Sequence, residues 1–220
     1  MKILGIDESG RGPVCGPLTM CGYLIDESKL TELKKSGAKD SKLLSASKRE
    51  ALAPLLKELA DDYVVLKISA KEIDDLRTES NLNIMEIERM QQLINALKPD
   101  KVIIDSPEVN VKKFSAKVMA RVRCKTQIVC ENFADRKYPV VGAASIIAKV
   151  ERDASIKKLH EQHGDFGSGY CHDEITIEFL RAWIKKNKEF PDFVRKSWFT
   201  AQWIKEQKEQ MAISKFLESR

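Results

Sequence analysis

The sequence has few histidines and no paired cysteine motif. Its three histidines are His160, His163 and His172, and none of its five cysteines has C-x-x-C spacing. Imidazole-based catalysis is therefore not the default interpretation, and nothing indicates a zinc or dithiol site. His160 and His163 lie three residues apart on a predicted helix, and we interpret them as a surface pair rather than as metal ligands. The odd number of cysteines favours reduced, mostly buried thiols.

Long hydrophobic runs, internal repeats and low-complexity linkers are also missing. No apolar run approaches the length needed to cross a bilayer. The first predicted strand starts at Met1 or Lys2, which leaves no room for a signal peptide. With 43% hydrophobic and 32% charged residues, we expect a globular, monomeric, cytoplasmic protein.

The excess of positive charge is small. Against 33 acidic residues stand 38 lysines and arginines, for a net charge of +5 over 220 residues. This balance permits a polyanionic partner without requiring one. The length fits one domain with a small appendage and a full hydrophobic core.

The most informative stretch is at the front of the chain. Residues 3–6 read as a short buried strand that runs into Asp7 and Glu8, followed by Gly10, Arg11 and Gly12. Adjacent carboxylates at a strand end are costly unless they are solvated or bound to a cation. They suggest a divalent metal, and an arginine between glycines suggests phosphate. The alternative is a strand end followed by an ordinary glycine turn.

Periodicity predicts an α/β protein. An antiparallel start is followed by alternating helices and parallel strands, which together predict a five-stranded mixed sheet with helices on both faces and a C-terminal helical appendage. Further strands are predicted at residues 18–25, 63–69, 101–104 and 126–130, and helices at 27–35, 46–60, 84–97, 111–121, from Pro139 onward, at 174–187 and at the end of the chain.

Three aspartates share a position at strand ends. Asp7 and Asp105 end predicted strands, and Asp135 follows another in a loop; Glu8 completes a set of four. Carboxylates about 4 Å apart repel by roughly 4 kcal/mol per pair at an effective dielectric near 20. Two Mg2+ or Mn2+ ions would resolve this repulsion and support phosphodiester hydrolysis. Neighbouring strand residues face opposite sides, however, so Asp7 and Glu8 can share a site only if the chain bends at Ser9-Gly10.

Seven ordered motifs make the chain resemble ribonuclease HII, the prokaryotic type 2 ribonuclease H, from end to end. They are Gly5-Ile-Asp-Glu-Ser-Gly-Arg-Gly12, Asp40-Ser-Lys-Leu-Leu-Ser45, Ile104-Asp-Ser-Pro107, Ala134-Asp-Arg-Lys-Tyr-Pro139, Ala143-Ala-Ser-Ile-Ile-Ala-Lys149 with Arg152-Asp153, Gly167-Ser-Gly-Tyr170 and Arg195-Lys-Ser-Trp198. The resemblance implies the ribonuclease H fold and assigns Asp7, Glu8, Asp105 and Asp135 as metal-binding catalytic carboxylates.

The resemblance also implies substrate contacts. It assigns Gly10, Arg11 and Gly12, with Tyr170, to sensing the 2′-hydroxyl at the DNA–RNA junction. Ser41 and Lys42 lie in a stretch that is near the substrate in the family, and Lys149, Arg195 and Lys196 are further candidate phosphate contacts. The alternatives are a half-buried loop tyrosine and solvated lysines, and Ser145 and Lys149 are candidates for positioning Asp135 instead.

The chain departs from the family pattern at two places. Cys171 and His172 follow Tyr170 where proline is common, and Gly142 stands where serine is usual, which we expect to matter little.

The tail carries a separate hypothesis. Gln210, Ile213, Phe216 and Leu217 match the spacing of peptides that dock on the replication sliding clamp. The alternative is a helical stripe that closes the core. We therefore divide the chain into a catalytic domain (1–165), a helical substrate-binding appendage (166–209) and a candidate clamp-binding tail (210–220).

The resemblance implies an endonuclease that cuts the RNA strand of RNA–DNA hybrids and cuts 5′ of ribonucleotides embedded in duplex DNA. It would leave 3′-hydroxyl and 5′-phosphate ends. Two alternatives stay open. The type 3 relative carries an extra N-terminal domain and a glutamate as its fourth carboxylate, and a catalytically silent hybrid-binding module would not need the four carboxylates.

Overall fold

The computed structural model describes residues 1–38, 41–78 and 81–218, and the side chains of Lys42 and of residues 211–218 lie outside that description. The chain forms two compact units. Unit 1 comprises Met1–Ser9, Thr19–Lys67 and Ser80–Asp153, and unit 2 comprises Gly10–Leu18, Ile68–Glu79 and Ala154–Arg220. The predicted division at residues 165 and 209 concerns function and stays a prediction.

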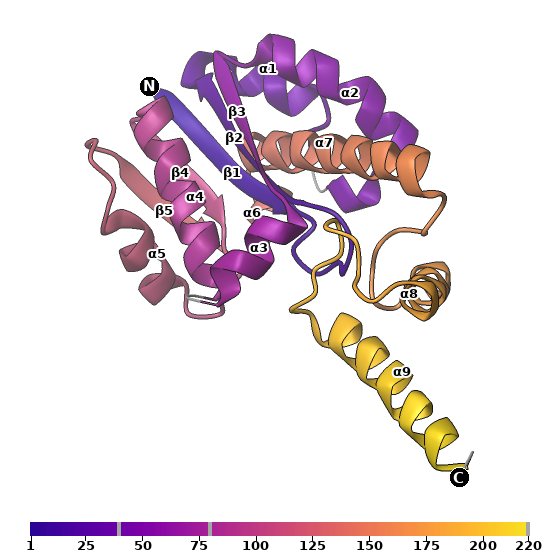
Figure 1. Cartoon of the computed structure of the whole chain (residues 1–220). Coiled ribbons are helices and arrows are strands. Elements are labelled where there is room, and N and C mark those ends of the chain that lie inside the picture. Colours follow the sequence, from indigo (N-terminus) through magenta and orange to yellow (C-terminus); the bar gives the residue numbers. More distant parts are fainter. Residues whose placement is uncertain (39–40, 79–80, 219–220) are drawn as a thin grey trace. The chain divides into compact units, whose positions relative to one another are not determined.

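Unit 1 is built on a five-stranded sheet with the order β3-β2-β1-β4-β5 (Figure 1). Strand β1 pairs antiparallel with β2 and parallel with β4, and β4 pairs parallel with β5. The predicted mixed sheet is therefore confirmed. The strands are β1 (Lys2–Ser9), β2 (Leu18–Asp26), β3 (Asp62–Ile68), β4 (Lys101–Asp105) and β5 (Gln127–Glu131).

Helices cover both faces of this sheet, as predicted. Alternate residues of the central strands supply two hydrophobic cores, one against helices α1, α2 and α7 and the other against α4 and α5. The helices and 3-10 turns outside unit 2's own elements are η1 (Glu27–Lys29), α1 (Leu30–Lys35), η2 (Ser41–Leu43), α2 (Ala46–Leu59), α4 (Leu82–Leu97), α5 (Val111–Met119), α6 (Ala134–Lys137) and α7 (Pro139–His163).

Strand β1 and helix α7 approach each other closely at Gly5. A Cβ atom added there would lie 2.3 Å from the carbonyl oxygen of Val140 and 2.7 Å from the backbone nitrogen of Val141. Any side chain would force the helix away from the strand. Gly142 has a similar function, because a Cβ would lie 2.8 Å from the carbonyl oxygen of Ala38. The expectation that this glycine matters little is therefore wrong.

Unit 2 contains α3 (Ala70–Arg77), α8 (Glu174–Lys186), α9 (Phe199–Glu218) and the end of α7. Its core is rich in aromatic residues, with Phe166, Phe190 and Phe193 packed beside Leu180 and Ile184. Sequence periodicity missed α3, although Ser69 and Glu72 form a capping box at its start. That pair of residues was the available signal.

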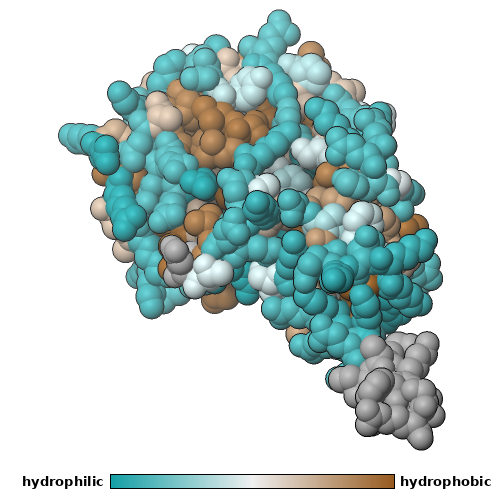
Figure 2. All heavy atoms as spheres, in the orientation of Figure 1, coloured by the Kyte–Doolittle hydropathy of each residue, from teal (hydrophilic) through white to brown (hydrophobic). Residues whose placement is uncertain are grey.

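Figure 2 shows a mainly hydrophilic face with an apolar patch over β2 and β3. Among the described residues, none of the helices combines the length and the apolarity that crossing a membrane requires. All five cysteines are free thiols; Cys15 and Cys21 are buried, and Cys124, Cys130 and Cys171 are half-buried.

Candidate active site

Asp7 and Asp105 lie side by side at the carboxyl edge of the sheet. The parallel register of β1 and β4 pairs Ile6 with Ile104, so the next residues of both strands are these two aspartates. Paired residues of neighbouring strands point to the same face. Asp7 is buried and Asp105 is half-buried, so neither charge is fully solvated.

Asp135 reaches the same edge through a short helix. It lies in α6, not in a loop as predicted, and its side chain is only 3% exposed. Phe133 starts this helix in the left-handed conformation, with φ 59°. The backbone N–H of Ala134 donates to Oδ1 of Asp105 at 2.9 Å. This bond ties the start of α6, and with it Asp135, to strand β4.

The three aspartates influence one another electrostatically. Burial raises the pKa of Asp7 to about 7, and the charges of Asp105 and Asp135 add to that shift. Two hydrogen bonds oppose it, one from the Ser145 side chain and one from the backbone N–H of Glu8, which lies 2.7 Å from Oδ1 of Asp7. The cluster therefore holds more negative charge than its hydrogen bonds compensate. Its hard oxygen donors fit Mg2+ or Mn2+.

Ser145 links the cluster to the loop at Ser41. The hydroxyl oxygens of Ser41 and Ser145 lie 2.8 Å apart, and both side chains are 5% exposed. Ser145 thus hydrogen-bonds to Asp7, whereas we expected it to position Asp135. Substrate contact by Ser41 stays a prediction, and its observed bond gives it a supporting role. The side chain of Lys42 lies outside the described residues.

Glu8 follows Asp7 in strand β1, where neighbouring side chains alternate between the two faces of the sheet. Strand β1 stays regular past this residue, since Glu8 pairs with Met20 and Ser9 with Thr19 in the antiparallel register. The pairing ends at Ser9, and Gly10 follows it with a φ of 88°. Within the described ranges, no three His, Cys, Asp or Glu side chains form a ready metal site. Metal binding by Asp7, Glu8, Asp105 and Asp135 stays a prediction.

In unit 2, the Gly10–Gly12 loop and the loop of Tyr170 are bonded together. The backbone N–H groups of Val14 and Cys15 donate to the Gly169 carbonyl at 2.8 and 3.1 Å. The Sγ atom of Cys171 lies 4.0 Å from the carbonyl oxygen of Gly12. The two predicted recognition segments are thus neighbours within this unit.

Hydrogen bonds to the Asp173 carboxylate hold the loop that contains Tyr170. This carboxylate accepts from the Ser168 backbone at 2.6 Å, the Ser168 hydroxyl at 2.5 Å and the Ile175 N–H at 3.1 Å. These bonds lower the pKa of Asp173. The Tyr170 ring is half-buried and lies 5.4 Å from the His172 ring, between centroids. These contacts form although Cys171 and His172 follow Tyr170, where proline is common in the family.

The predicted basic contacts differ in their surroundings. Lys149 pairs with Asp153 at 2.5 Å, and Lys196, 41% exposed, pairs with Asp192 at 3.6 Å. Arg195 is fully buried, so its assignment as a phosphate contact is wrong.

In the tail, α9 continues to Glu218 and Gln210 is exposed. The side chains of Ile213, Phe216 and Leu217 lie outside the described residues.

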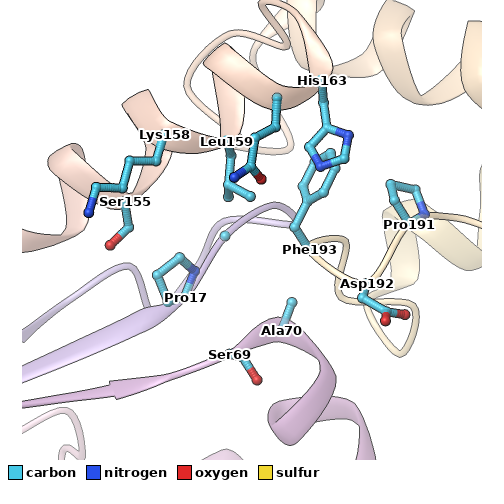
Figure 3. A pocket seen from close by; sticks show the side chains of 12 residues that line it. Pro17, Ser69, Ala70, Ser155, Lys158, Leu159, His163, Pro191, Asp192 and Phe193 are labelled. Atoms are coloured by element: carbon cyan, nitrogen blue, oxygen red, sulfur yellow. The ribbon is translucent and has the colours of Figure 1, made fainter.

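Unit 2 also contains a cavity of about 590 Å3 (Figure 3). Pro17, Ala70, Leu159 and Phe193 supply apolar walls, and Lys158 is among the polar residues that line it. Of the predicted site residues that the structure describes, none lines this cavity. Local contacts account for His160 and His163. The ring centroids of His163 and Phe193 lie 4.7 Å apart, and Nε2 of His160 bonds to the carbonyl oxygen of Gly167.

Comparison with known proteins gives one family over nearly the whole chain. The family model described as ribonuclease HII matches residues 4–201. Ribonuclease HII of Pyrococcus horikoshii is 42% identical over 221 residues, which cover 99% of this chain and 100% of the relative.

Solved structures agree with this result. The crystal structure of ribonuclease H2 from Pyrococcus horikoshii superposes with a TM-score of 0.89 at 42% identity, covering 94% of this chain and 98% of that one. The structure of a PCNA:RNase HII complex from Archaeoglobus fulgidus gives 0.84 at 39% identity, with coverages of 90% and 95%.

Proposed function

The chain belongs to the ribonuclease HII family, metal-dependent nucleases that act on RNA–DNA hybrids, and from this premise we propose that it also cuts 5′ of single ribonucleotides embedded in duplex DNA. The observation that carries the proposal is the convergence of Asp7, Asp105 and Asp135 at one sheet edge, where the pKa of Asp7 is raised. Such a shift marks a site that lacks compensating positive charge.

Asp7, Asp105 and Asp135, with Glu8, are the residues that would hold two divalent ions. When bound, such a pair activates a water molecule and neutralises charge on the leaving oxygen. The chain's own residues prepare this site. Burial keeps water from solvating Asp7, and the hydrogen bond from Ser145 fixes the orientation of its carboxylate. No nucleophilic side chain is required, and the products would carry 3′-hydroxyl and 5′-phosphate ends.

Substrate selection falls to unit 2 in this proposal. Gly10, Arg11, Gly12 and Tyr170 contact the ribose at the DNA–RNA junction, where the 2′-hydroxyl distinguishes RNA from DNA. Lys42, Lys149 and Lys196 contact phosphates, which contribute affinity rather than sequence information. Support for the first group comes from the bonds that hold both recognition loops together in unit 2.

Cleavage of a 5′-labelled DNA duplex with one embedded ribonucleotide tests the proposal. We expect a cut on the 5′ side of the ribonucleotide with Mg2+ or Mn2+, and no cut with a chelator or on the all-DNA duplex. A cut on the 3′ side, or cleavage that persists in the chelator, contradicts the proposal. A hybrid with a continuous RNA strand serves as the positive control for the family activity.

We also propose that the tail binds a sliding clamp. The related protein from Archaeoglobus fulgidus is described in a complex with PCNA. The backbone of α9 is helical over the motif, and Gln210, its first residue, is exposed. A short helical turn is the form in which such peptides fill a hydrophobic pocket.

Pull-down with a recombinant archaeal clamp compares the full chain with a chain ending at residue 209 and with Phe216→Ala. We expect both variants to lose binding while cleavage of a short hybrid is unchanged. Clamp binding equal to that of the full chain would refute the docking proposal. A loss of thermal stability in the shortened chain would favour the alternative of a core-closing stripe.

A further inference from the structure

All three carbonyl groups of the Gly10–Gly12 loop are bound by one distant segment of unit 2. The guanidinium of Arg195 donates to the carbonyl oxygen of Gly10 at 2.5 Å and to that of Arg11 at 2.9 Å. The indole Nε1–H of Trp198 donates to the carbonyl oxygen of Gly12 at 3.1 Å. Three consecutive peptide planes are thereby fixed from one side by the 195–198 segment.

The 195–198 segment is itself held by ring contacts and by hydrogen bonds to α3. Two guanidinium groups contact the Trp198 ring, those of Arg77 and Arg195, each 4.8 Å from its centroid. Asp74 of α3 accepts from the backbone N–H groups of Lys196 and Ser197 at 2.7 and 3.0 Å. The donors therefore have little freedom to follow a moving loop.

Burying the charged side chain of Arg195 costs free energy. Its side chain is fully buried, and it also donates through Nε to the Gly16 carbonyl at 3.1 Å. A buried charge is tolerated because hydrogen bonds satisfy it, and an apolar residue of similar volume often stabilises a core at least as well. What an apolar residue could not supply is a fixed direction for the Gly10 and Arg11 carbonyls.

The opposite side of the loop is open at Gly12. Gly10 needs to be glycine because its φ is 88°, but Gly12 has no left-handed conformation. A Cβ atom added at Gly12 would meet nothing within 4 Å, and the residue is exposed. The packing of the described chain therefore does not account for this glycine, whereas close approach of a ligand would.

We propose that Arg195 and Trp198 are positioning residues for ribonucleotide selection: they set the geometry of the loop that reads the ribose. The inference rests on the proposed function of Gly10, Arg11 and Gly12. Because phosphate contacts supply most of the affinity for a duplex, a misplaced loop lowers kcat on a ribonucleotide substrate more than it raises KM.

Trp198→Phe is the sharpest test, because it removes the N–H donor to Gly12 while keeping an aromatic ring against the two guanidinium groups. Trp203→Phe is the matched control, since that indole stacks on Arg181 at 5.6 Å. On a duplex with one ribonucleotide we expect kcat to fall about 2- to 10-fold in Trp198→Phe, the range of one lost hydrogen bond. KM and the Mg2+ concentration for half-maximal rate stay within about twofold, as expected when phosphate and metal contacts are retained.

Arg195→Lys keeps the charge, but its donors all lie on one nitrogen, whereas Arg195 uses three separate nitrogens for the carbonyls of Gly10, Arg11 and Gly16. We expect a loss in kcat of about 100-fold if the variant folds. Hydrogen exchange at the amides of residues 10–12 supplies a readout independent of activity, and it should accelerate in Trp198→Phe but not in Trp203→Phe. Unchanged exchange, or a kcat loss equal to that of Trp203→Phe, overturns the inference. An inactive wild-type chain with accelerated exchange in Trp198→Phe would instead refute the proposed function and leave the loop geometry standing.

Discussion

The two candidate sites are stabilised in opposite ways. The aspartate cluster of unit 1 collects like charges in a buried position, and its hydrogen bonds do not offset that cost for Asp7. The Gly10–Gly12 loop of unit 2 has each of its three carbonyl groups satisfied by Arg195 or Trp198. The carboxylates proposed for chemistry thus need a bound cation to offset their repulsion. The backbone proposed for recognition is already fixed by hydrogen bonds within the chain.

Replacing Asp7 tests the first side of this comparison with the largest expected effect. Asp7→Asn removes a charge from the cluster, and we expect the cleavage rate to fall by about 10³-fold or more, because metal-assisted charge stabilisation is worth several kcal/mol. Hybrid binding should be retained or improved, as measured by fluorescence anisotropy. Glu131→Gln is the control, since Glu131 pairs with Asp105 in the sheet but bonds to Lys137 and Tyr138. Normal cleavage by Asp7→Asn would refute the assignment.

The stability of the metal-free protein should depend on pH through Asp7. Its folded pKa is raised from 3.8 to about 7, so the unfolded chain loses this proton first as the pH rises. The free energy of unfolding is therefore highest, as far as Asp7 is concerned, below pH 4. It falls between pH 4 and 7, by roughly 4 kcal/mol at most for three pKa units.

Divalent metal should reverse that loss. We expect added Mg2+ to raise the Tm more at pH 8 than at pH 5, and we expect Asp7→Asn to raise the metal-free Tm at pH 8. Differential scanning fluorimetry with and without chelator measures both effects. An equal Mg2+ shift at the two pH values would show that the cluster is not the site of stabilisation.

Gly12→Ala tests the second side of the comparison. Because a Cβ there meets nothing within 4 Å, thermal stability should be unchanged. Cleavage of a single-ribonucleotide duplex should fall about tenfold or more, since a methyl group would hold the sugar away from the loop. Gly10→Ala provides the contrast, because its φ of 88° predicts a stability loss of about 1 kcal/mol. Full activity of Gly12→Ala would remove this glycine from the recognition site.

Ser145→Ala should give the smallest effect. It removes a hydrogen bond that lowers the pKa of Asp7, so that pKa should rise further. We expect the Mg2+ concentration for half-maximal rate to increase about 2- to 10-fold, the range of one hydrogen bond. Ser41→Ala, which removes only the next hydroxyl in the chain of contacts, should have less effect. The reverse order would indicate that Ser41 contacts the substrate directly.

Much of unit 1 could be predicted from sequence because its information is local. Short apolar runs, several of them rich in valine and isoleucine, indicated the strands, and the strand ends indicated the positions of Asp7 and Asp105. Asp135 was harder, because α6 has only four residues and begins at Phe133 in a conformation that non-glycine residues rarely adopt. Glu8 stays a difficulty, because neighbouring side chains in a regular strand alternate between the faces of the sheet.

The role of Arg195 could not be predicted, because its partners lie up to 185 residues away in the chain. Sequence gives no sign of such a contact, and an arginine in a polar stretch is usually solvated. Gly142 was misjudged for a similar reason, since the carbonyl that requires a small residue belongs to Ala38.

Unit 2 is assembled from three separate pieces of the chain, and this bears on its synthesis. Residues 10–18 leave the ribosome early, yet the side chains that fix the Gly10–Gly12 loop follow only near the C-terminus. An incomplete nascent chain would carry every aspartate of the cluster while the loop that we propose to contact the ribose was still unformed. Contacts of such long sequence separation also fold slowly. Selectivity for ribonucleotides would therefore be the last property that a growing molecule acquires.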